Sequence, residues 1–261
     1  MIELIRASRF VTPLREGGSL PGIVEASDLG TYVVKFRGAG QGLKALVAEV
    51  VVGELGRRLG LRVPDLRALE LPAAIGRYEA DEEVQDLLTA SIGLNLAVDF
   101  LPGSFGWDAG HELAPDEAAR VLWLDAFTAN VDRSWRNPNL LLWHRELWLI
   151  DHGAALYFHH SWDGPNAAAD RFARQPYDSS DHVLVRYRSA VPSVDGELAD
   201  RIDENLLVEV LAQVPDEWLE PGPSRPDPAA VRAGYLDYLL ARLAHRDAWL
   251  PVADESAEVA R

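Results

Sequence analysis

The first part of the chain alternates short apolar runs with turn residues. Three runs rich in aliphatic and β-branched side chains lie at residues 2–7, 21–26 and 31–36, and a glycine pair and an Asp-Leu-Gly turn separate them. Such runs predict a β-meander. From Leu43 to Leu59 the apolar side chains recur at intervals of three and four residues, and Gly60 follows. This periodicity predicts an amphipathic helix that ends at the glycine.

Two further apolar runs predict strands at residues 66–71 and 94–101, with a polar helical stretch at residues 80–92 between them. Pro102 and Gly103 then interrupt the pattern. The first hundred residues therefore combine several strands with one strong helix.

The next part of the chain begins with a helical pattern. A helix opens at Pro115 and runs to about Asn130, with acidic residues in its first turn, where the helix macrodipole favours them. A polar segment follows, and then two short apolar runs at residues 140–143 and 147–151. These two runs predict a hairpin.

The C-terminal stretch, residues 195–250, is helical by pattern and is interrupted by the proline-rich segment at residues 221–228. A small β-rich part therefore precedes a larger, mainly helical part. We expect an α+β fold with two lobes, an N-lobe of residues 1–101 and a C-lobe of residues 102–261.

The composition narrows the class of partner. The chain has 261 residues, of which 48% are hydrophobic, which is enough for a large core. Its formal charge of −16 repels phosphate backbones, so we expect no nucleic-acid partner. Cysteine is absent, which excludes disulfides, thiol nucleophiles and thiolate metal sites. No window of 18 uncharged apolar residues occurs, so we expect no membrane partner and a cytoplasmic location.

Two carboxylates flank the predicted hairpin. Asp132 lies in the polar segment before it, followed by Asn137 and Asn139, and Asp151 closes its second apolar run. A hairpin can bring its two ends within a few ångströms of each other, and carboxylate and amide oxygens suit Mg²⁺. Asp132 and the asparagines are also ordinary turn residues. Asp151, at the end of a buried strand, needs a partner.

The series NVDRSWRNPNLLL (130–142), a short hairpin and then LIDHG (149–153) resembles the catalytic and metal loops of kinases of the HipA family, which are related to the protein-kinase and aminoglycoside-phosphotransferase folds. The resemblance implies that Asp132 is the catalytic base and that Asp151 binds magnesium in an Asp-His-Gly triplet. His152 stands where the family usually has an apolar residue. Asn137 has the usual spacing from Asp132, whereas Asn139 directly precedes the apolar strand, so either is a candidate second ligand.

The N-terminal part resembles the nucleotide-binding part of the same family. Lys35, in the run TYVVKF, is similar to the family's ATP-contacting lysine, and Glu49 on the following helix is similar to its partner glutamate. Glu54 is the alternative partner, although it would point to a different face of the helix. A lysine in a β-branched run is also a common way to protect an edge strand.

Two loops and one strand end complete the resemblance. Residues Gly17, Gly18 and Ser19 resemble the glycine-rich phosphate cradle, and Asp99, Phe100 and Leu101 resemble the hinge that binds adenine. A second glycine cluster, at residues 37–42, fits either a loop over the nucleotide or a plain connection.

The resemblance thus implies a two-lobed HipA-like kinase that uses ATP and Mg²⁺ to phosphorylate a hydroxyl acceptor, a serine or threonine of a protein. The chain is shorter than a full HipA toxin, so the resemblance does not by itself imply the docking surface of that toxin for its DNA-binding antitoxin. One alternative is a pseudokinase that binds nucleotide or a partner without turnover.

A second alternative is a metal hydrolase. His144, His152, His159 and His160 lie close to Asp151 in the sequence. The helical His-x-x-x-His arrangement is absent, however, and the side chains of an adjacent His-His pair would diverge on a strand.

Overall fold

The computed structural model describes residues 1–15, 20–40, 42–77, 79–162 and 169–251. Its strands are β1 (Leu4–Pro13), β2 (Gly22–Ala26), β3 (Thr31–Lys35), β4 (Leu66–Leu71), β5 (Gly93–Asp99), β6 (Phe105–Gly106), β7 (Leu140–Trp143) and β8 (Glu146–Leu149). Its α-helices are α1 (Gly42–Arg58), α2 (Glu82–Ala90), α3 (Pro115–Thr128), α4 (Ala169–Ala173), α5 (Val191–Asp200), α6 (Glu204–Leu211), α7 (Pro228–Ala244) and α8 (Arg246–Trp249). Three 3₁₀ turns are η1 (Tyr157–His160), η2 (Val185–Ala190) and η3 (Asp216–Trp218). The predicted strands, helices and hairpin are confirmed.

The N-terminal strands close into a barrel in the order β1-β2-β3-β5-β4. The predicted meander forms its first three strands, and parallel pairing of Leu4–Arg6 in β1 with β4 closes it. Two register shifts in β1 allow the strand to bend between its two neighbours. The barrel interior holds its own hydrophobic cluster, which includes Val24, Val34 and Leu69.

Helix α1 belongs to a second and larger hydrophobic cluster, which it shares with α3 and the C-terminal helices. Eleven of its 17 residues are buried, because apolar side chains cover most of its circumference. Gly60 ends the helix in a left-handed conformation with φ of +88°, and Leu61 donates its amide hydrogen to the Gly56 carbonyl at 2.9 Å.

Helix α3 and the β7–β8 hairpin hold the segment between them in place. Pro115 begins α3, and Ala129, with φ of +52°, reverses the chain after it. Strand pairing runs from Leu140 opposite Leu149 to Trp143 opposite Glu146. The segment of residues 130–139 is therefore anchored by the end of α3 on one side and by the start of β7 on the other.

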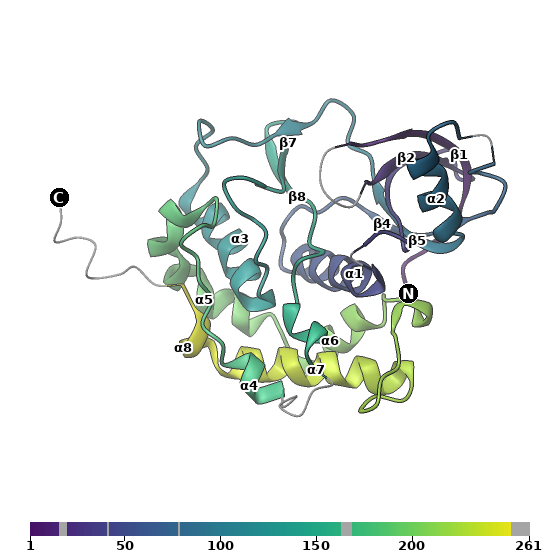
Figure 1. Cartoon of the computed structure of the whole chain (residues 1–261). Helices are drawn as coiled ribbons and strands as arrows, with labels where there is room; N and C mark the ends of the chain where they lie inside the picture. Colours follow the sequence, from purple (N-terminus) through teal and green to yellow (C-terminus); the bar gives the residue numbers. More distant parts are fainter. Residues whose placement is uncertain (16–19, 41, 78, 163–168, 252–261) are drawn as a thin grey trace.

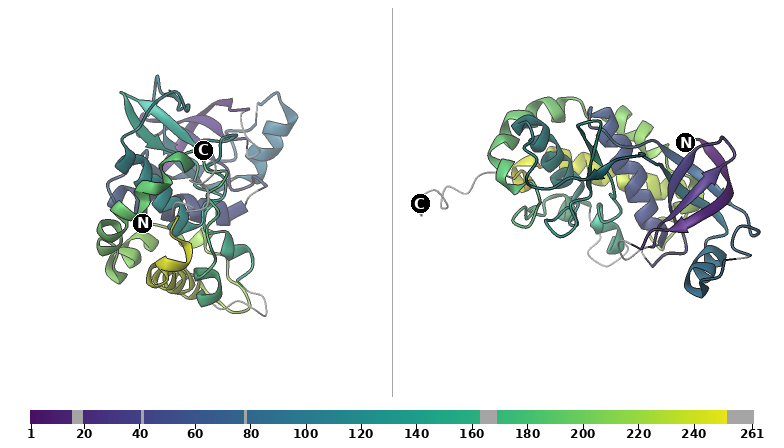
Figure 2. Two further views of the ribbon diagram at one scale, coloured as in Figure 1. Left: turned by 90° about the vertical axis from the view of Figure 1, so that its left-hand side faces the viewer. Right: turned by 90° about the horizontal axis from the view of Figure 1, so that it is seen from above.

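Figure 1 shows the barrel and α2 at one end of the molecule, helices α3, α5 and α8 at the opposite end, and α1 between them. The view from above in Figure 2 shows the same separation. This arrangement is the α+β fold that the sequence predicts, with a β-rich N-terminal part and a helical C-terminal part. No helix among the described residues is long and apolar enough to cross a membrane.

Candidate active site

Three charged side chains from different elements meet where β3 ends. Lys35 is the last residue of β3, Glu49 lies in α1, and Asp151 follows β8. The Lys35 ammonium donates hydrogen bonds to Glu49 Oε1 and, at 2.6 Å, to Asp151 Oδ1. The side chain of Glu49 is 3% exposed and that of Asp151 is 39% exposed. Lys35 therefore connects the barrel to α1 and to the segment after the hairpin, and Asp151 remains accessible.

Burial and charge act in opposite directions on this triad. Burial would lower the pKa of Lys35, but Glu49 and Asp151 outweigh it and raise that pKa, so the lysine is charged. Burial would raise the pKa of Asp151, but Lys35 outweighs it and holds that pKa at about 2. Burial raises the pKa of Glu49 to about 7 despite Lys35. Asp151 is therefore an anion, whereas the more deeply buried Glu49 takes up a proton more readily.

The second candidate carboxylate, Asp132, lies on the other side of the hairpin end. Asn137 Nδ2 donates to Asp132 Oδ2 at 2.7 Å, and Asn139 Nδ2 lies 3.4 Å from the same oxygen. Asn139 Nδ2 also lies 3.5 Å from the carbonyl oxygen of Asp151. The amide of Asn139 thus lies between the two loops, and these contacts leave the Oδ1 atoms of both asparagines unused among the described residues.

Backbone strain and a buried guanidinium fix both loops. Asn139 has φ of +50° and Asp151 has φ of +54°. This left-handed conformation costs about 1–3 kcal/mol and persists only where surrounding contacts offset that cost. Arg133, 1% exposed, donates Nη1–H to the Asn139 carbonyl and, at 3.4 Å, to the Ile150 carbonyl. One side chain therefore holds the backbone next to Asn139 and Asp151.

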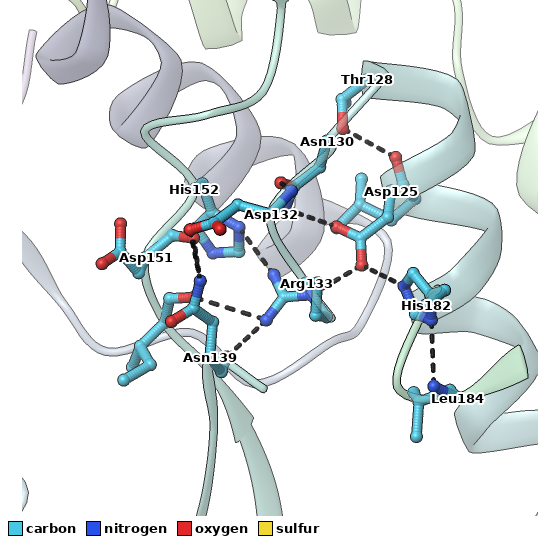
Figure 3. A network of polar contacts seen from close by, with 12 residues as sticks. Asp125, Thr128, Asn130, Asp132, Arg133, Asn139, Asp151, His152, His182 and Leu184 are labelled. Carbon is cyan, nitrogen blue, oxygen red and sulfur yellow. Dashed lines mark hydrogen bonds and ion pairs between the residues drawn. The ribbon is translucent and has the colours of Figure 1, made fainter. Parts of the chain in front are cut away.

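Arg133 belongs to a buried polar network beneath the loops, which Figure 3 shows. Its Nε donates to Asp125 Oδ2 at 2.6 Å, and His182 Nε2 lies 3.0 Å from the same oxygen. Asn130 Nδ2 donates to Asp125 Oδ1 at 2.9 Å, and Asn130 Oδ1 accepts the amide hydrogen of Asp132 at 3.1 Å. The buried carboxylate of Asp125 thus supports the loop that carries Asp132.

The sequence pattern did not lead us to predict this network. A signal was present in the helix sequence VLWLDAF, where a single aspartate, Asp125, stands among apolar residues that are all buried. A buried carboxylate requires charged or hydrogen-bonding partners. Its partner His182 lies 57 residues away, however, in a stretch without a recognisable motif.

His152 remains neutral mainly because it is buried. Burial first, and then the charges of Arg133 and Lys35, lower its pKa to about 3. Its Nδ1 lies 3.2 Å from Arg133 Nη2, which is a donor, so Nδ1 accepts and the ring proton resides on Nε2. His152 Nε2 is buried and has no partner among the described residues.

The remaining candidates either lie outside the described residues or make other contacts. Gly17, Gly18 and Ser19 lie outside the described residues. Glu54 lies 3.6 Å from Arg57 and does not pair with Lys35. The amide hydrogen of Gly38, in the second glycine cluster, is donated to Ser91 Oγ at 3.1 Å, and this part of the cluster is a connection packed on the end of α2.

The candidate hinge residues lie at the end of β5, where Asp99 is the last residue of the strand and Phe100 and Leu101 follow it. The amide of Asp99 donates to the Asp65 carbonyl at 2.8 Å, and the amide of Phe100 donates to the Thr31 carbonyl at 3.1 Å. The amide of Leu101 has no hydrogen-bond partner among the described residues. The first two amides are therefore occupied within the protein, and that of Leu101 is free.

The histidines do not form a multi-ligand metal centre. Among residues 1–15, 20–40, 42–77, 79–162 and 169–251, no group of three or more His, Cys, Asp or Glu side chains could hold a metal ion. The expectation that His159 and His160 diverge is wrong, because they lie on the 3₁₀ turn η1 with their Nε2 atoms 3.2 Å apart. His159 Nδ1 contacts the Tyr235 hydroxyl at 3.0 Å.

The donor atoms beside Lys35 suit magnesium better than zinc. Asp151 is held as an anion with partial exposure, and the unused Oδ1 atom of Asn139 is an uncharged oxygen near it. Mg²⁺ prefers one or two carboxylates together with neutral oxygens, water and phosphate oxygens. The residues present therefore fit a magnesium ion bound together with phosphates.

Comparison with known proteins identifies a matching family and a solved structure with a similar fold. Residues 7–252 match the family model described as HipA-like kinase. The crystal structure of the Helicobacter pylori proinflammatory kinase CtkA is similar with a TM-score of 0.57 and 12% identity, over 90% of this chain and 93% of that chain. The Golgi casein kinase is similar with a TM-score of 0.47 and 11% identity, over 94% of this chain and 73% of that chain. No curated protein sequence matches significantly.

Proposed function

Because this chain belongs to the HipA-like kinase family, we propose that it transfers the γ-phosphoryl group of ATP to a serine or threonine hydroxyl of a protein, with Mg²⁺ as cofactor. The observation that carries the proposal is the position of Lys35, whose ammonium contacts both Glu49 and Asp151. Phosphoryl transfer requires little covalent chemistry from a protein and depends on held phosphates and charge stabilisation. These three residues supply both.

Lys35 is the proposed phosphate-binding cation. Its ammonium is charged because Glu49 and Asp151 raise its pKa, and a buried cation interacts strongly with an anion brought next to it. Glu49, almost fully buried, keeps the lysine in position. Asp151 and Asn139 are the proposed magnesium ligands, and the ion would neutralise charge that develops on the phosphates. Asn137 remains beside Asp132 and orients its carboxylate.

Asp132 is the proposed base. Its Oδ2 is held by Asn137 and approached by Asn139, so the carboxylate has a fixed direction. In the proposed step the acceptor hydroxyl gives its proton to Asp132 while its oxygen forms a bond to the γ-phosphorus. The bond between that phosphorus and the bridging β,γ-oxygen breaks, and ADP leaves with the electron pair.

The adenine would bind at the end of β5. The amides of Asp99 and Phe100 are already used within the protein, so we assign adenine recognition to the free amide of Leu101 and to backbone carbonyls beside it. A backbone contact of this kind fixes the orientation of the base without a charged side chain. The proposed glycine-rich cradle of Gly17, Gly18 and Ser19 would cover the phosphates.

The test separates binding from transfer. Purified protein is incubated with γ-labelled ATP, Mg²⁺ and a protein or peptide mixture, and ATP affinity is measured in parallel by calorimetry. Asp132→Asn should reduce transfer at least about 100-fold, because a positioned base contributes roughly that much, and should leave ATP affinity within about threefold. Asp86→Asn, an exposed change on α2, is the control.

Two outcomes would count against the proposal. Equal transfer by the wild type and by Asp132→Asn would remove Asp132 from the chemistry. ATP binding by the wild type without hydrolysis, autophosphorylation or transfer to any acceptor would favour the pseudokinase alternative.

A further inference from the structure

A cavity of about 550 Å³ lies beside the loop that carries Asp132. Val131, Arg133 and Ser134 of that loop form one wall, and η1, the segment 175–182 and Tyr238 of α7 form the others. The volume lies in the range of pockets that bind ligands. The mechanism proposed above makes no use of this cavity.

The cavity is next to the proposed base along the chain. Val131 and Arg133, which line it, are the immediate neighbours of Asp132, and Ser134 donates its amide hydrogen to the Asp132 carbonyl at 2.7 Å. An extended peptide rises about 3.3 Å per residue. An acceptor whose hydroxyl is at Asp132 would therefore reach the cavity with a side chain two or three residues away.

Two exposed carboxyl side chains line the cavity. Asp178 and Asp181 line it, are exposed, and have no ion-pair partner among the described residues. The amide of Ser180 holds the pKa of Asp178 below its usual value, so this group is an anion. Arg133 is neutralised by its buried pair with Asp125.

His182 adds no charge to balance these carboxylates. Its Nδ1 accepts the amide hydrogen of Leu184 at 3.0 Å, so the ring proton is on Nε2 and points to Asp125. The lining therefore has two carboxylates without a free cation to match them.

The rest of the lining combines aromatic side chains with Ser161, Gln175 and Pro176. Phe158 and Tyr238 are buried and stack on each other with ring centroids 3.6 Å apart, whereas Tyr157 is 61% exposed. Val131, on the loop itself, is 66% exposed. The exposed ring of Tyr157 and the apolar side chain of Val131, together with the carboxylates, suit a cation that has an apolar stem, as in arginine and lysine side chains.

We propose that this cavity binds an arginine or lysine side chain of the acceptor protein, and so directs phosphorylation to a hydroxyl two or three residues from a basic residue. This inference rests on the proposed function, since it assigns the acceptor's sequence context. It agrees with the formal charge of −16, which favours basic partners.

The test uses a synthetic peptide library. Each peptide has one serine, and arginine, glutamine or glutamate at one position within three residues of it. Label transfer from ATP is measured for the wild type, for the double variant Asp178→Asn/Asp181→Asn, and for the matched control Asp86→Asn/Asp200→Asn, which removes two exposed carboxylates elsewhere. Asparagine at 178 still accepts from the Ser180 amide, so the local turn is kept.

The wild type and the control should prefer arginine over glutamine about 10-fold at one position, in kcat/KM and mainly through KM. The double variant should lose this preference and keep its ATP hydrolysis without peptide. A wild type without preference, or a double variant that keeps it, overturns the inference.

Direct binding separates this inference from the proposed function. Calorimetry of the preferred peptide, or of the arginine library if no transfer occurs, should show affinity for the wild type that falls about 10-fold in Asp178→Asn/Asp181→Asn and weakens with salt. Equal affinity in both proteins refutes the cavity's role even if ATP is hydrolysed. If the wild type binds the peptide but does not bind ATP, the proposed function is refuted instead.

Discussion

Replacing His152 by glutamine should make the protein's stability less sensitive to acid between pH 6 and 4.5. The pKa of His152 is lowered to about 3 by burial and by Arg133, whereas in the unfolded chain it is about 6.5. Between these two values the unfolded state binds a proton that the folded state does not. Stability therefore falls as the pH falls, by about 1.4 kcal/mol per pH unit for this one group.

Other groups also change protonation between pH 6 and 4.5, so the quantity to compare is the slope of unfolding free energy against pH in the two proteins. His159, whose pKa is lowered by burial, also destabilises the folded state as pH falls. Glu49 does the opposite, because its pKa of about 7 lets the folded state keep a proton that the unfolded chain releases above about 4.5. These groups are the same in both proteins, so the stability of His152→Gln should fall less steeply than that of the wild type, by about 1.4 kcal/mol per pH unit.

Urea unfolding followed by tryptophan fluorescence at several values between pH 6 and 4.5 measures these slopes. Glutamine is neutral throughout and can still accept a hydrogen bond from Arg133, so the fold should persist. His111→Gln, a change at an exposed histidine, is the control. Equal slopes for the wild type and His152→Gln would refute the reasoning, because the histidine would then titrate alike in both states.

Three further changes test the site and its support. Asp125→Asn should destabilise the protein by about 3–5 kcal/mol in urea unfolding, since it leaves the buried guanidinium of Arg133 without its anion; a loss below about 1 kcal/mol would contradict this. Gly60→Ala should cost about 1 kcal/mol because φ is +88°, while Gly40→Ala, which has open space around it, should not; equal effects would remove the strain argument. Asp151→Asn should weaken ATP affinity at least about 10-fold with Mg²⁺ and much less in EDTA, and a loss of equal size in both would place the residue outside the metal site.

The local elements followed from the sequence because their signals are local. The apolar period of α1, the glycine that ends it and the two runs of the hairpin all depend on residues within one or two turns of each other. The pairing of Lys35 with Glu49 was predicted from the resemblance to the HipA family, with Glu54 as the alternative, and the structure shows the contact with Glu49.

Long-range contacts had no such signal. Closure of the barrel depends on pairing of Leu4–Arg6 with β4, more than 60 residues away, and a strand sequence does not state its partner. The Asp125–His182 contact and the cavity walls at 175–182 likewise depend on how distant segments fold back. The sequence thus predicted the candidate reacting groups but not the side chains that support them.

The burial of α1 limits how this molecule can be switched. Many protein kinases are controlled by movement of the helix that carries the glutamate partner of the ATP-binding lysine. In this protein Val50, Val51 and Leu55 of α1, the helix that carries Glu49, are completely buried. A rotation of α1 that exposed only these three side chains to water would cost about 5–9 kcal/mol. Displacement of the barrel would expose Leu66, Ala68 and Leu96 of β4 and β5, which belong to the same hydrophobic cluster as α1. The contact between Lys35 and Glu49 is therefore held by apolar packing on both the helix and the strand side.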